Sequence, residues 1–393
     1  MDAAKRILIM QWEYAKGGGA SAQTVTELAG ELLRHGHDVE VVAQAPRGRP
    51  DVAVPPGLRL TLTRAPGLAL AGAHSRAWGQ LAFLAGVLLR TPRYVRSKDC
   101  VITLESPPGL GLVGVLLRRV SRCRIRHLCW VLDLYDDQFL ALHVPDRYAG
   151  LRRVFRALDH MALARASEVV VVGECMRDYL RRQGIRNTIS VIPVWQDAGR
   201  IHPSDGSAVR ERLGLGGGPC LLYSGHATYR HPLTPLIEAA RQLPALTLVI
   251  AGTGESFEAA RALVERYQLH NVRVEPPVPA HELNTLLSSG DLHAVVLDPR
   301  ATGTCVPSKA YAAMAVAKPL LFLGDDRSQV ARDVRAGDCG AVVDPAKLSA
   351  LVEVLRDWIS DPDGWAKRGR AGYAFFVRFR EKRYACSEWL HHL

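Results

Sequence analysis

The chain has 393 residues, of which 48% are hydrophobic, and a formal net charge of +11. This composition excludes a disordered chain, and the length is sufficient for two ordinary α/β domains. The eight cysteines form no C-x-x-C pair, which indicates reduced thiols and argues against a zinc site or disulfides. The longest apolar stretches fall short of the roughly 20 residues of a spanning helix. The N-terminus lacks the apolar core of a signal peptide, so we expect a cytoplasmic protein.

The positive charge is concentrated in the first half of the chain. Residues 1–200 contain 28 lysines and arginines against 18 acidic residues, whereas residues 201–393 contain 22 against 21. The excess gathers beside apolar segments, which is typical of a peripheral surface resting on an anionic membrane. The alternative is an arginine-rich surface that is only solvated. Nucleic acid is not an expected partner, because no aromatic platform or helix-turn-helix signature accompanies the arginines.

The first half begins as a doubly wound parallel sheet. An apolar strand at 5–13 precedes a glycine loop at 14–20, a helix over 21–35 and a strand over 38–43. Ligands of such sheets bind at the carboxyl ends of the strands, so this loop is expected to face a ligand. The alternation continues with strands at 100–104, 126–132 and 168–172, and helices at 81–89, 110–120, 151–165 and 175–183.

A second alternation follows a polar stretch. Residues 196–207 lack a hydrophobic period and contain a proline, so we predict an interdomain linker there. A strand at 190–194 precedes this stretch. Beyond it, strands are predicted at 220–224, 247–251, 272–275, 292–297, 320–323 and 341–343, with helices between them at 233–242, 257–267, 281–288, 308–317 and 348–360. The prediction is α/β, with two Rossmann-like doubly wound domains facing a cleft. They cover residues 1–195 and 208–370, and residues 371–393 form a C-terminal helix that packs back on the first domain.

Residues 306–326 carry the strongest chemical signal. Pro307, Ser308 and Lys309 open a helix of small residues, a proline closes it, and an apolar strand follows. The start of such a helix offers unpaired N–H groups and the positive end of the dipole, to which Ser308 adds a hydroxyl and Lys309 an ammonium. Lysine is ill placed at that end of a dipole unless an anion binds there. The segment therefore predicts the diphosphate grip of a nucleotide-sugar site.

Two glycine motifs are less specific. The loop Gly17-Gly18-Gly19 lets the backbone approach a phosphate or sugar closely, and a structural tight turn would have the same sequence. The G-x-G at Gly252 and Gly254 lacks the third glycine and the acidic partner of a dinucleotide fingerprint. A redox cofactor is therefore not predicted.

The motifs occur in a specific order: ESPPG at 105–109, WVLDLYDD at 130–137, VIPVW at 191–195, LLYSGHATYRH at 221–231 and VPSKAYAAMAVAKPLLFLGDD at 306–326. Together with the glycine loop they resemble the family 4 retaining glycosyltransferases of GT-B fold, including bacterial O-antigen, capsule and metabolite transferases. The resemblance implies that the first domain binds the acceptor. It implies that the second binds a nucleoside-diphosphate sugar, usually a UDP-sugar, without a required metal or other cofactor.

The resemblance assigns donor binding to Gly18, Gly19, Gly225, His226, Arg230, Ser308, Lys309 and Gln329. Arg230 corresponds to a basic residue that neutralises the departing diphosphate. Gln329 stands where relatives often carry a glutamate that bonds the ribose hydroxyls. Two further glutamates of many relatives correspond here to Thr304 and Ala312. Either the chain grips the donor differently or its activity is lower.

For the acceptor hydroxyl, the resemblance implies a first-domain carboxylate or histidine near the anomeric centre. Asp133 is the candidate catalytic residue, because it follows a buried strand, and Asp136 is the second choice. A turn cap at the strand end is the alternative role. The leading hypothesis is transfer of a hexose or amino-hexose, with retention, to a lipid-linked, polysaccharide or small-molecule acceptor. The alternatives are an enzyme like the UDP-sugar 2-epimerases and a non-catalytic GT-B subunit that supports a partner transferase.

Overall fold

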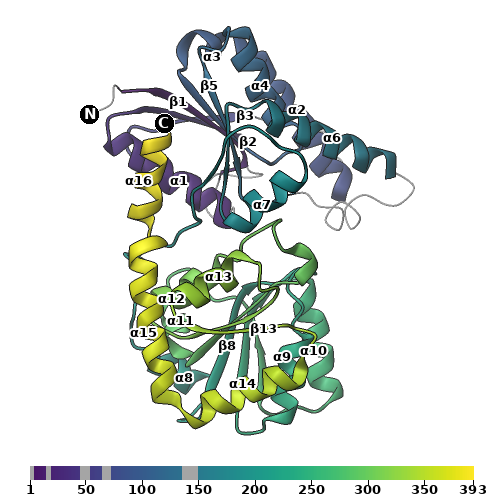
Figure 1. Ribbon diagram of the computed structural model, residues 1–393, viewed down its shortest axis with the longest axis vertical. Coiled ribbons are helices and arrows are strands. Elements are labelled where there is room, and N and C mark those ends of the chain that lie inside the picture. The colour runs from purple at the N-terminus through teal and green to yellow at the C-terminus, as the bar shows by residue number, and fades with distance from the viewer. Residues whose placement is uncertain (1–3, 15–18, 45–53, 64–71, 135–148) are drawn as a thin grey trace. The chain divides into compact units, whose positions relative to one another are not determined.

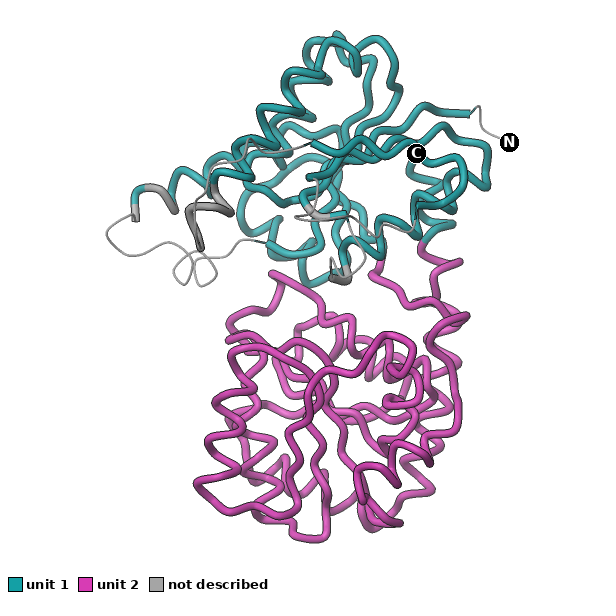
Figure 2. Tube along the Cα trace, turned by 180° about the vertical axis from the view of Figure 1, so that it is seen from behind, with its two compact units in different colours: residues 1–192, 386–393 teal, residues 193–385 magenta. Residues whose placement is uncertain are grey.

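A computed structural model describes residues 4–14, 19–44, 54–63, 72–134 and 149–393. The chain divides into two compact units (Figure 2). Unit 1 comprises Met1–Ile192 and Cys386–Leu393, and unit 2 comprises Pro193–Ala385. The stretch expected as a linker, 196–207, bonds to other parts of unit 2: Gln196 N donates to Arg380 O at 3.2 Å, and His202 N to Asn284 Oδ1 at 2.9 Å.

Unit 1 contains a parallel sheet of seven described strands in the order β3-β2-β1-β4-β5-β6-β7. The strands are β1 (Arg6–Glu13), β2 (Asp38–Gln44), β3 (Arg59–Thr63), β4 (Cys100–Leu104), β5 (Arg126–Val131), β6 (Glu168–Val171) and β7 (Ile189–Val191). The central strands are continuous apolar runs, because helices cover both faces of a parallel sheet. Ile7, Leu8, Ile9 and Met10 of β1 are accordingly inaccessible to solvent.

The helices of unit 1 are α1 (Gly19–Arg34), α2 (Gly72–Leu89), α3 (Thr91–Ser97), α4 (Leu110–Val120), α6 (Ala149–Arg165), α7 (Glu174–Arg182) and the end of α16 (Lys382–His392). Helix α4 contacts α2, α3 and α6, and Figure 1 shows these four grouped together. No helix among the described residues is both long and apolar enough to cross a membrane.

The last residues of the chain belong to unit 1. The ring of Trp389 meets that of Trp130 on β5 edge-on, with centroids 4.7 Å apart. His392 Nδ1 lies 2.7 Å from Glu168 Oε1 at the start of β6. Residues 386–393 therefore cover two strands of unit 1, whereas α15 (Pro362–Phe379) contacts α12 and β13 in unit 2.

Unit 2 contains a second parallel sheet, ordered β10-β9-β8-β11-β12-β13. The strands are β8 (Cys220–His226), β9 (Thr247–Thr253), β10 (Val272–Glu275), β11 (Leu292–Val296), β12 (Leu320–Leu323) and β13 (Gly340–Val343). Helices α8 (Ser207–Arg212), α9 (Thr234–Gln242), α10 (Glu255–Arg266), α11 (Leu283–Ser289), α12 (Lys309–Ala315), α13 (Gln329–Ala336), α14 (Leu348–Ser360) and α15 accompany them. The strand order reverses between β8 and β11, which makes their carboxyl ends the expected ligand-binding edge.

The two doubly wound sheets confirm the predicted α/β fold class. Every strand predicted from an apolar run is present within a few residues of its expected bounds. The sequence analysis missed β3, α3 and α8. Strand β3 alternates polar and apolar residues over only five positions, and α3 and α8 have seven and six residues, too few to show a helical period.

Candidate functional site

Lys309, the first residue of α12, reaches the carboxyl end of β8. Its Nζ donates to the Tyr223 hydroxyl at 2.7 Å and to the backbone oxygen of His226, and it lies 4.8 Å from the centre of the Tyr223 ring. Within the described part of the chain, no carboxylate lies within ion-pair distance of Lys309. Burial lowers the pKa of this lysine to about 7. The ammonium is therefore held by neutral groups and is well suited to meet an anion.

The path of the Lys309 side chain requires a glycine at position 225. Gly225 has a φ of +119°, and a Cβ there would lie 2.8 Å from Lys309 Cε. The neighbouring strand end is equally close, because a Cβ on Gly252 would lie 2.1 Å from the Gly225 oxygen. The G-x-G motif after β9 therefore serves close backbone packing against β8.

Two other basic side chains lie near the same strand end. Arg230 is only 7% exposed, and its Nε donates to the Tyr229 hydroxyl at 3.1 Å. His226 Nδ1 lies 3.2 Å from Thr253 Oγ1. The partly buried His231 reports these charges: desolvation first, and then Lys309, Arg230 and His226, lower its pKa to about 3. The region is therefore electropositive.

The loop that carries Arg230 is tied to the end of β11. The backbone oxygen of Arg230 accepts a hydrogen bond from Asp298 N at 2.7 Å. Asp298 follows β11, and its carboxylate is engaged by the Arg300 side chain at 2.6 Å. The structure thus brings Gly225, His226, Arg230 and Lys309 together at the switch point of the sheet.

Ser308 and Gln329 have different surroundings. Ser308 is the N-cap of α12 and makes no capping hydrogen bond with its side chain. Helix α12 has seven residues, fewer than predicted, so its dipole contributes less than the side-chain charges. Gln329 begins α13, is 6% exposed, and donates from Nε2 to Asp333 Oδ1 at 2.8 Å. Asp333 also accepts from the Tyr311 hydroxyl, so Gln329 belongs to a buried hydrogen-bond network.

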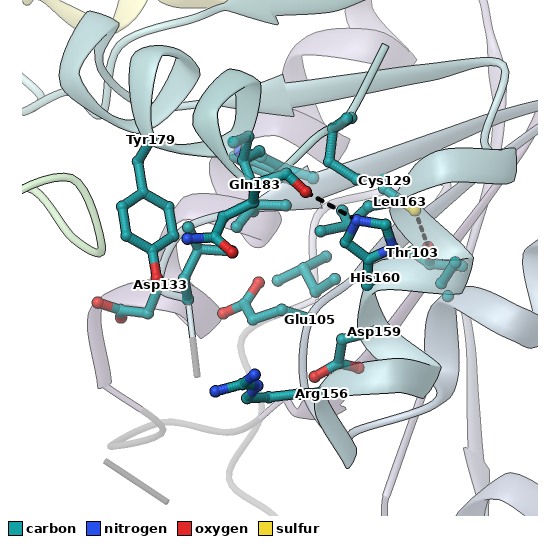
Figure 3. Close-up of a pocket in the computed structure, with 18 of the residues that line it drawn as sticks. Thr103, Glu105, Cys129, Asp133, Arg156, Asp159, His160, Leu163, Tyr179 and Gln183 are labelled. Atoms are coloured by element: carbon teal, nitrogen blue, oxygen red, sulfur yellow. Dashed lines mark hydrogen bonds between the residues drawn. The ribbon is translucent and has the colours of Figure 1, made fainter. Parts of the chain in front are cut away.

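The candidates of the first half lie in unit 1. Gly18 and Asp136 are outside the described residues, and Gly19 is the first residue of α1. Asp133 comes two residues after β5 and lines a cavity of about 350 Å³ (Figure 3). Glu105, directly after the neighbouring strand β4, lines the same cavity. Parallel strands end at the same edge of a sheet, which brings these two carboxyl groups together.

Helices α6 and α7 complete this cavity. Figure 3 shows Asp159 and Arg156 of α6 and Tyr179 of α7 around the Glu105 carboxyl group. Apolar side chains, among them Leu163, form part of the wall, and further polar side chains, among them His160 and Gln183, also line it. The cavity therefore combines an apolar wall with several carboxyl groups, as a binding site for a polyhydroxylated molecule does.

Two of these carboxyl groups have raised pKa values, which favours their protonated forms. Burial, and then the charge of Asp133, raise the pKa of Glu105 to about 8. Burial raises the pKa of Asp159 to about 7. Each also accepts a backbone hydrogen bond at 3.3 Å, Glu105 from Leu132 N and Asp159 from Gly109 N. A protonated carboxyl group both donates and accepts, which suits the hydroxyl groups of a ligand.

Sequence reasoning missed the roles of Glu105 and Asp159. Glu105 follows a buried strand as Asp133 does, so its position was a usable signal. Asp159 lies inside α6, where a carboxylate is usually only solvated, and nothing local marks it. Within the described residues, no group of three or more His, Cys, Asp and Glu side chains could hold a metal ion.

Comparison with known families identifies the class of protein. Residues 19–195 match the Glycosyl transferase 4-like domain, and residues 207–375 match Glycosyl transferases group 1. The chain therefore belongs to the glycosyltransferase family that these two domains define, as its motifs indicated. No curated protein sequence matches the chain.

Solved structures of GT-B glycosyltransferases share its fold. Sucrose-phosphate synthase from Thermosynechococcus elongatus is 18% identical with a TM-score of 0.79, covering 99% of this chain and 98% of that one. Anabaena HepE in complex with UDP-glucose is 17% identical with a TM-score of 0.74, covering 99% and 100%. WaaG, a glycosyltransferase of lipopolysaccharide biosynthesis, is 17% identical with a TM-score of 0.71, covering 97% and 99%.

If UDP binds at Lys309, as proposed below, replacing Gly225 with alanine is expected to weaken UDP binding by about tenfold, which is about 1.4 kcal/mol, because the new Cβ displaces the Lys309 side chain. Isothermal titration calorimetry measures the affinity. Gly216→Ala is the matched control, since Gly216 also has a positive φ, +56°, but a Cβ there meets no atom within 4 Å. Equal UDP affinity of Gly225→Ala and wild type would refute the steric argument.

The raised pKa of Glu105 predicts a pH-dependent stability. Between about pH 4.5 and 8 the folded protein keeps a proton that the unfolded chain loses, so stability falls as pH rises through this window. Glu105→Gln is neutral throughout and should flatten the decline, raising Tm at pH 9 by about 2–4 °C for each kcal/mol recovered. Thermal unfolding followed by circular dichroism from pH 5 to 9 tests this. Glu258→Gln, on the exposed side of α10, should keep the wild-type slope. An unchanged slope in Glu105→Gln would contradict the prediction.

Proposed function

We propose that the protein transfers a hexose or amino-hexose from a UDP-sugar to an acceptor hydroxyl, with retention at the anomeric carbon. The observation that carries this proposal is the partly buried Lys309 ammonium, held by neutral groups at the switch point of unit 2 beside the buried Arg230. Acceptors of three kinds suit the site: lipid-linked, polysaccharide and small-molecule. The enzyme meets them in the cytoplasm or at the inner face of a bacterial plasma membrane.

The donor diphosphate binds between Lys309 and Arg230. Lys309 contributes an ammonium already oriented by Tyr223, and Arg230 adds a second charge that stabilises the negative leaving group as the glycosidic bond breaks. The Ser308 hydroxyl and the N–H groups around Gly225 and His226 supply hydrogen bonds to the phosphate oxygens. The HepE structures with UDP and with UDP-glucose support uridine as the base. No metal or organic cofactor is needed, because the side-chain cations perform the neutralisation.

The acceptor binds in the cavity of unit 1. Its hydroxyl groups exchange hydrogen bonds with the protonated Glu105 and Asp159, and Asp133 orients the hydroxyl that attacks. Retention follows when this hydroxyl attacks from the face that the diphosphate leaves. The acceptor proton then passes to the departing phosphate oxygen or to Asp133. Gln329 and Gly19 are proposed to contact the ribose and the donor diphosphate respectively.

Turnover distinguishes this function from its alternatives. Purified protein is incubated with UDP-sugars, with and without an extract containing acceptors. UDP release that requires acceptor supports a transferase. Interconversion of the UDP-sugar would instead indicate an epimerase, and binding without turnover a supporting subunit. Lys309→Met should lower kcat/KM by about 10²–10³-fold, the usual loss for one charge-stabilising group. Lys367→Met, an exposed lysine of α15, is the control.

The low pKa of Lys309 predicts proton uptake on donor binding. Near pH 8 this lysine is mostly neutral in the free protein, and a bound diphosphate favours its charged form, so the complex takes up a proton. Donor affinity should therefore fall as pH rises above about 7. Calorimetry with UDP-glucose at pH 8, in buffers of different ionisation enthalpy, measures the uptake. Lys309→Met should show none, and an equal uptake in both proteins would refute the assignment.

A further inference from the structure

Exposed apolar side chains are concentrated on one part of unit 1. Among the described residues nine large hydrophobic side chains are exposed, and only Val54 and Val377 lie outside α2, α4 and α6. The other seven are Trp78, Leu81, Leu88, Leu89, Leu116, Val120 and Val154. Leu89 is 82% exposed and Leu81 is 61% exposed, so neither side chain contributes to the core of the unit. Scattered exposed residues need no explanation, but a group on adjoining helices indicates a binding surface.

The spacing shows that these residues share faces of their helices. On α2, Trp78, Leu81, Leu88 and Leu89 are separated by three, seven and one positions, which places them on one side of a helix. On α4, Leu116 and Val120 are four positions apart. Because α4 contacts both α2 and α6, the three helices form one continuous layer. We call the outward side of this layer, with α3, the apolar-basic face.

Arginines surround the apolar residues. Residues 90–126 contain nine lysines and arginines against two acidic residues. Arg96 on α3, Arg119 on α4 and Arg122 just after it are exposed, and no described carboxylate lies within ion-pair distance of them. On α6, Val154 stands beside the exposed Arg153. The face thus offers apolar side chains for insertion and unpaired cations for an anionic partner.

We infer that the apolar-basic face is a docking surface for an anionic lipid bilayer, into whose headgroup region the leucines of α2 insert. The charge pattern selects this partner, because unpaired arginines around a shallow apolar patch complement anionic headgroups above acyl chains. A protein partner with an apolar interface core would leave the many surrounding arginines without compensating charge.

The position of the face fits the proposed acceptor site. Helix α6 contributes Val154 and Arg153 near this face, and Arg153, Arg156 and Asp159 to the cavity of unit 1. A bilayer docked on the face therefore lies next to the element that holds the proposed acceptor. Lipid-linked acceptors are favoured over soluble ones for this reason, and this last step rests on the proposed function.

Vesicle sedimentation tests the inference. The full-length protein is mixed with phosphatidylcholine vesicles or with vesicles containing about one third phosphatidylglycerol, which carry a negative surface potential. It should sediment with the anionic vesicles and bind the neutral ones at least about tenfold more weakly. Binding should weaken by about tenfold or more when salt is raised from about 0.1 M to about 1 M, because the Debye length shortens from about 10 to 3 Å.

Variants separate the apolar and the electrostatic components of vesicle binding. Leu88→Glu with Leu89→Glu should reduce vesicle binding by about tenfold or more, since the leucines lose their apolar contacts and the glutamates repel the lipid. Arg96→Glu with Arg119→Glu should have a similar effect at low salt. Val377→Glu, an exposed valine of unit 2, is the matched control and should bind as wild type does. UDP titration confirms that the donor site is intact, so failed docking and a failed transferase assignment are distinguishable.

Three outcomes would overturn the inference. The first is the absence of sedimentation with anionic vesicles at low salt, and the second is equal binding to neutral vesicles. The third is wild-type vesicle binding by the Leu88 and Leu89 double variant. If gel filtration shows a dimer that this double variant dissociates, and vesicles are not bound, the face joins two copies of the chain.

Discussion

The proposed chemistry of this protein depends on the partly buried ammonium group of Lys309, which has no carboxylate within ion-pair distance among the described residues. A buried lysine is costly, and its ordinary remedy is a nearby acidic side chain. At Lys309 the described structure offers only a phenol and a backbone oxygen, so the charged form remains poorly compensated. In the proposed function, the donor diphosphate supplies the missing charge. Binding of an anion therefore compensates the charge of the lysine, and this compensation contributes to the binding free energy. A neutral ligand would gain no such contribution, so the site suits an anion better.

Two glycines in the backbone around this lysine determine where its side chain lies. Gly225 leaves room for the side chain of Lys309, and Gly252 lets the end of β9 come close to the end of β8. Both glycines therefore decide where the ammonium lies. The two units then use one topology with different polar groups at the strand ends. Unit 2 gathers cations at its strand ends, whereas unit 1 gathers carboxyl groups around Glu105 and Asp133.

Much of the fold could be predicted from the sequence, because parallel strands are continuous apolar runs separated by helices of clear period. The position of Lys309 at the start of a helix was also predictable, from the Pro-Ser-Lys sequence that precedes the small residues of α12. Contacts between segments distant in the sequence could not be predicted. The link of Gln329 to Asp333, the packing of Trp389 on Trp130 and the entry of Asp159 into the cavity all depend on tertiary structure. The apolar segment at 81–89 beside the arginines could be located from the sequence, but which of its side chains are exposed could not, because a sequence does not show which face of a helix is covered.

The structure also bears on the two glutamates that many relatives carry and this chain lacks. Thr304 is 1% exposed, and its hydroxyl donates to the backbone oxygen of Ala301 at 2.8 Å, so the position is filled and its polar group is satisfied. A glutamate there would need more space and a partner for its charge. In this chain the Lys309 ammonium is oriented by the Tyr223 hydroxyl and the His226 carbonyl. Neutral groups can orient an ammonium without neutralising it. Loss of the glutamates is therefore compatible with donor binding, because the positive charge of Lys309 stays available to the diphosphate.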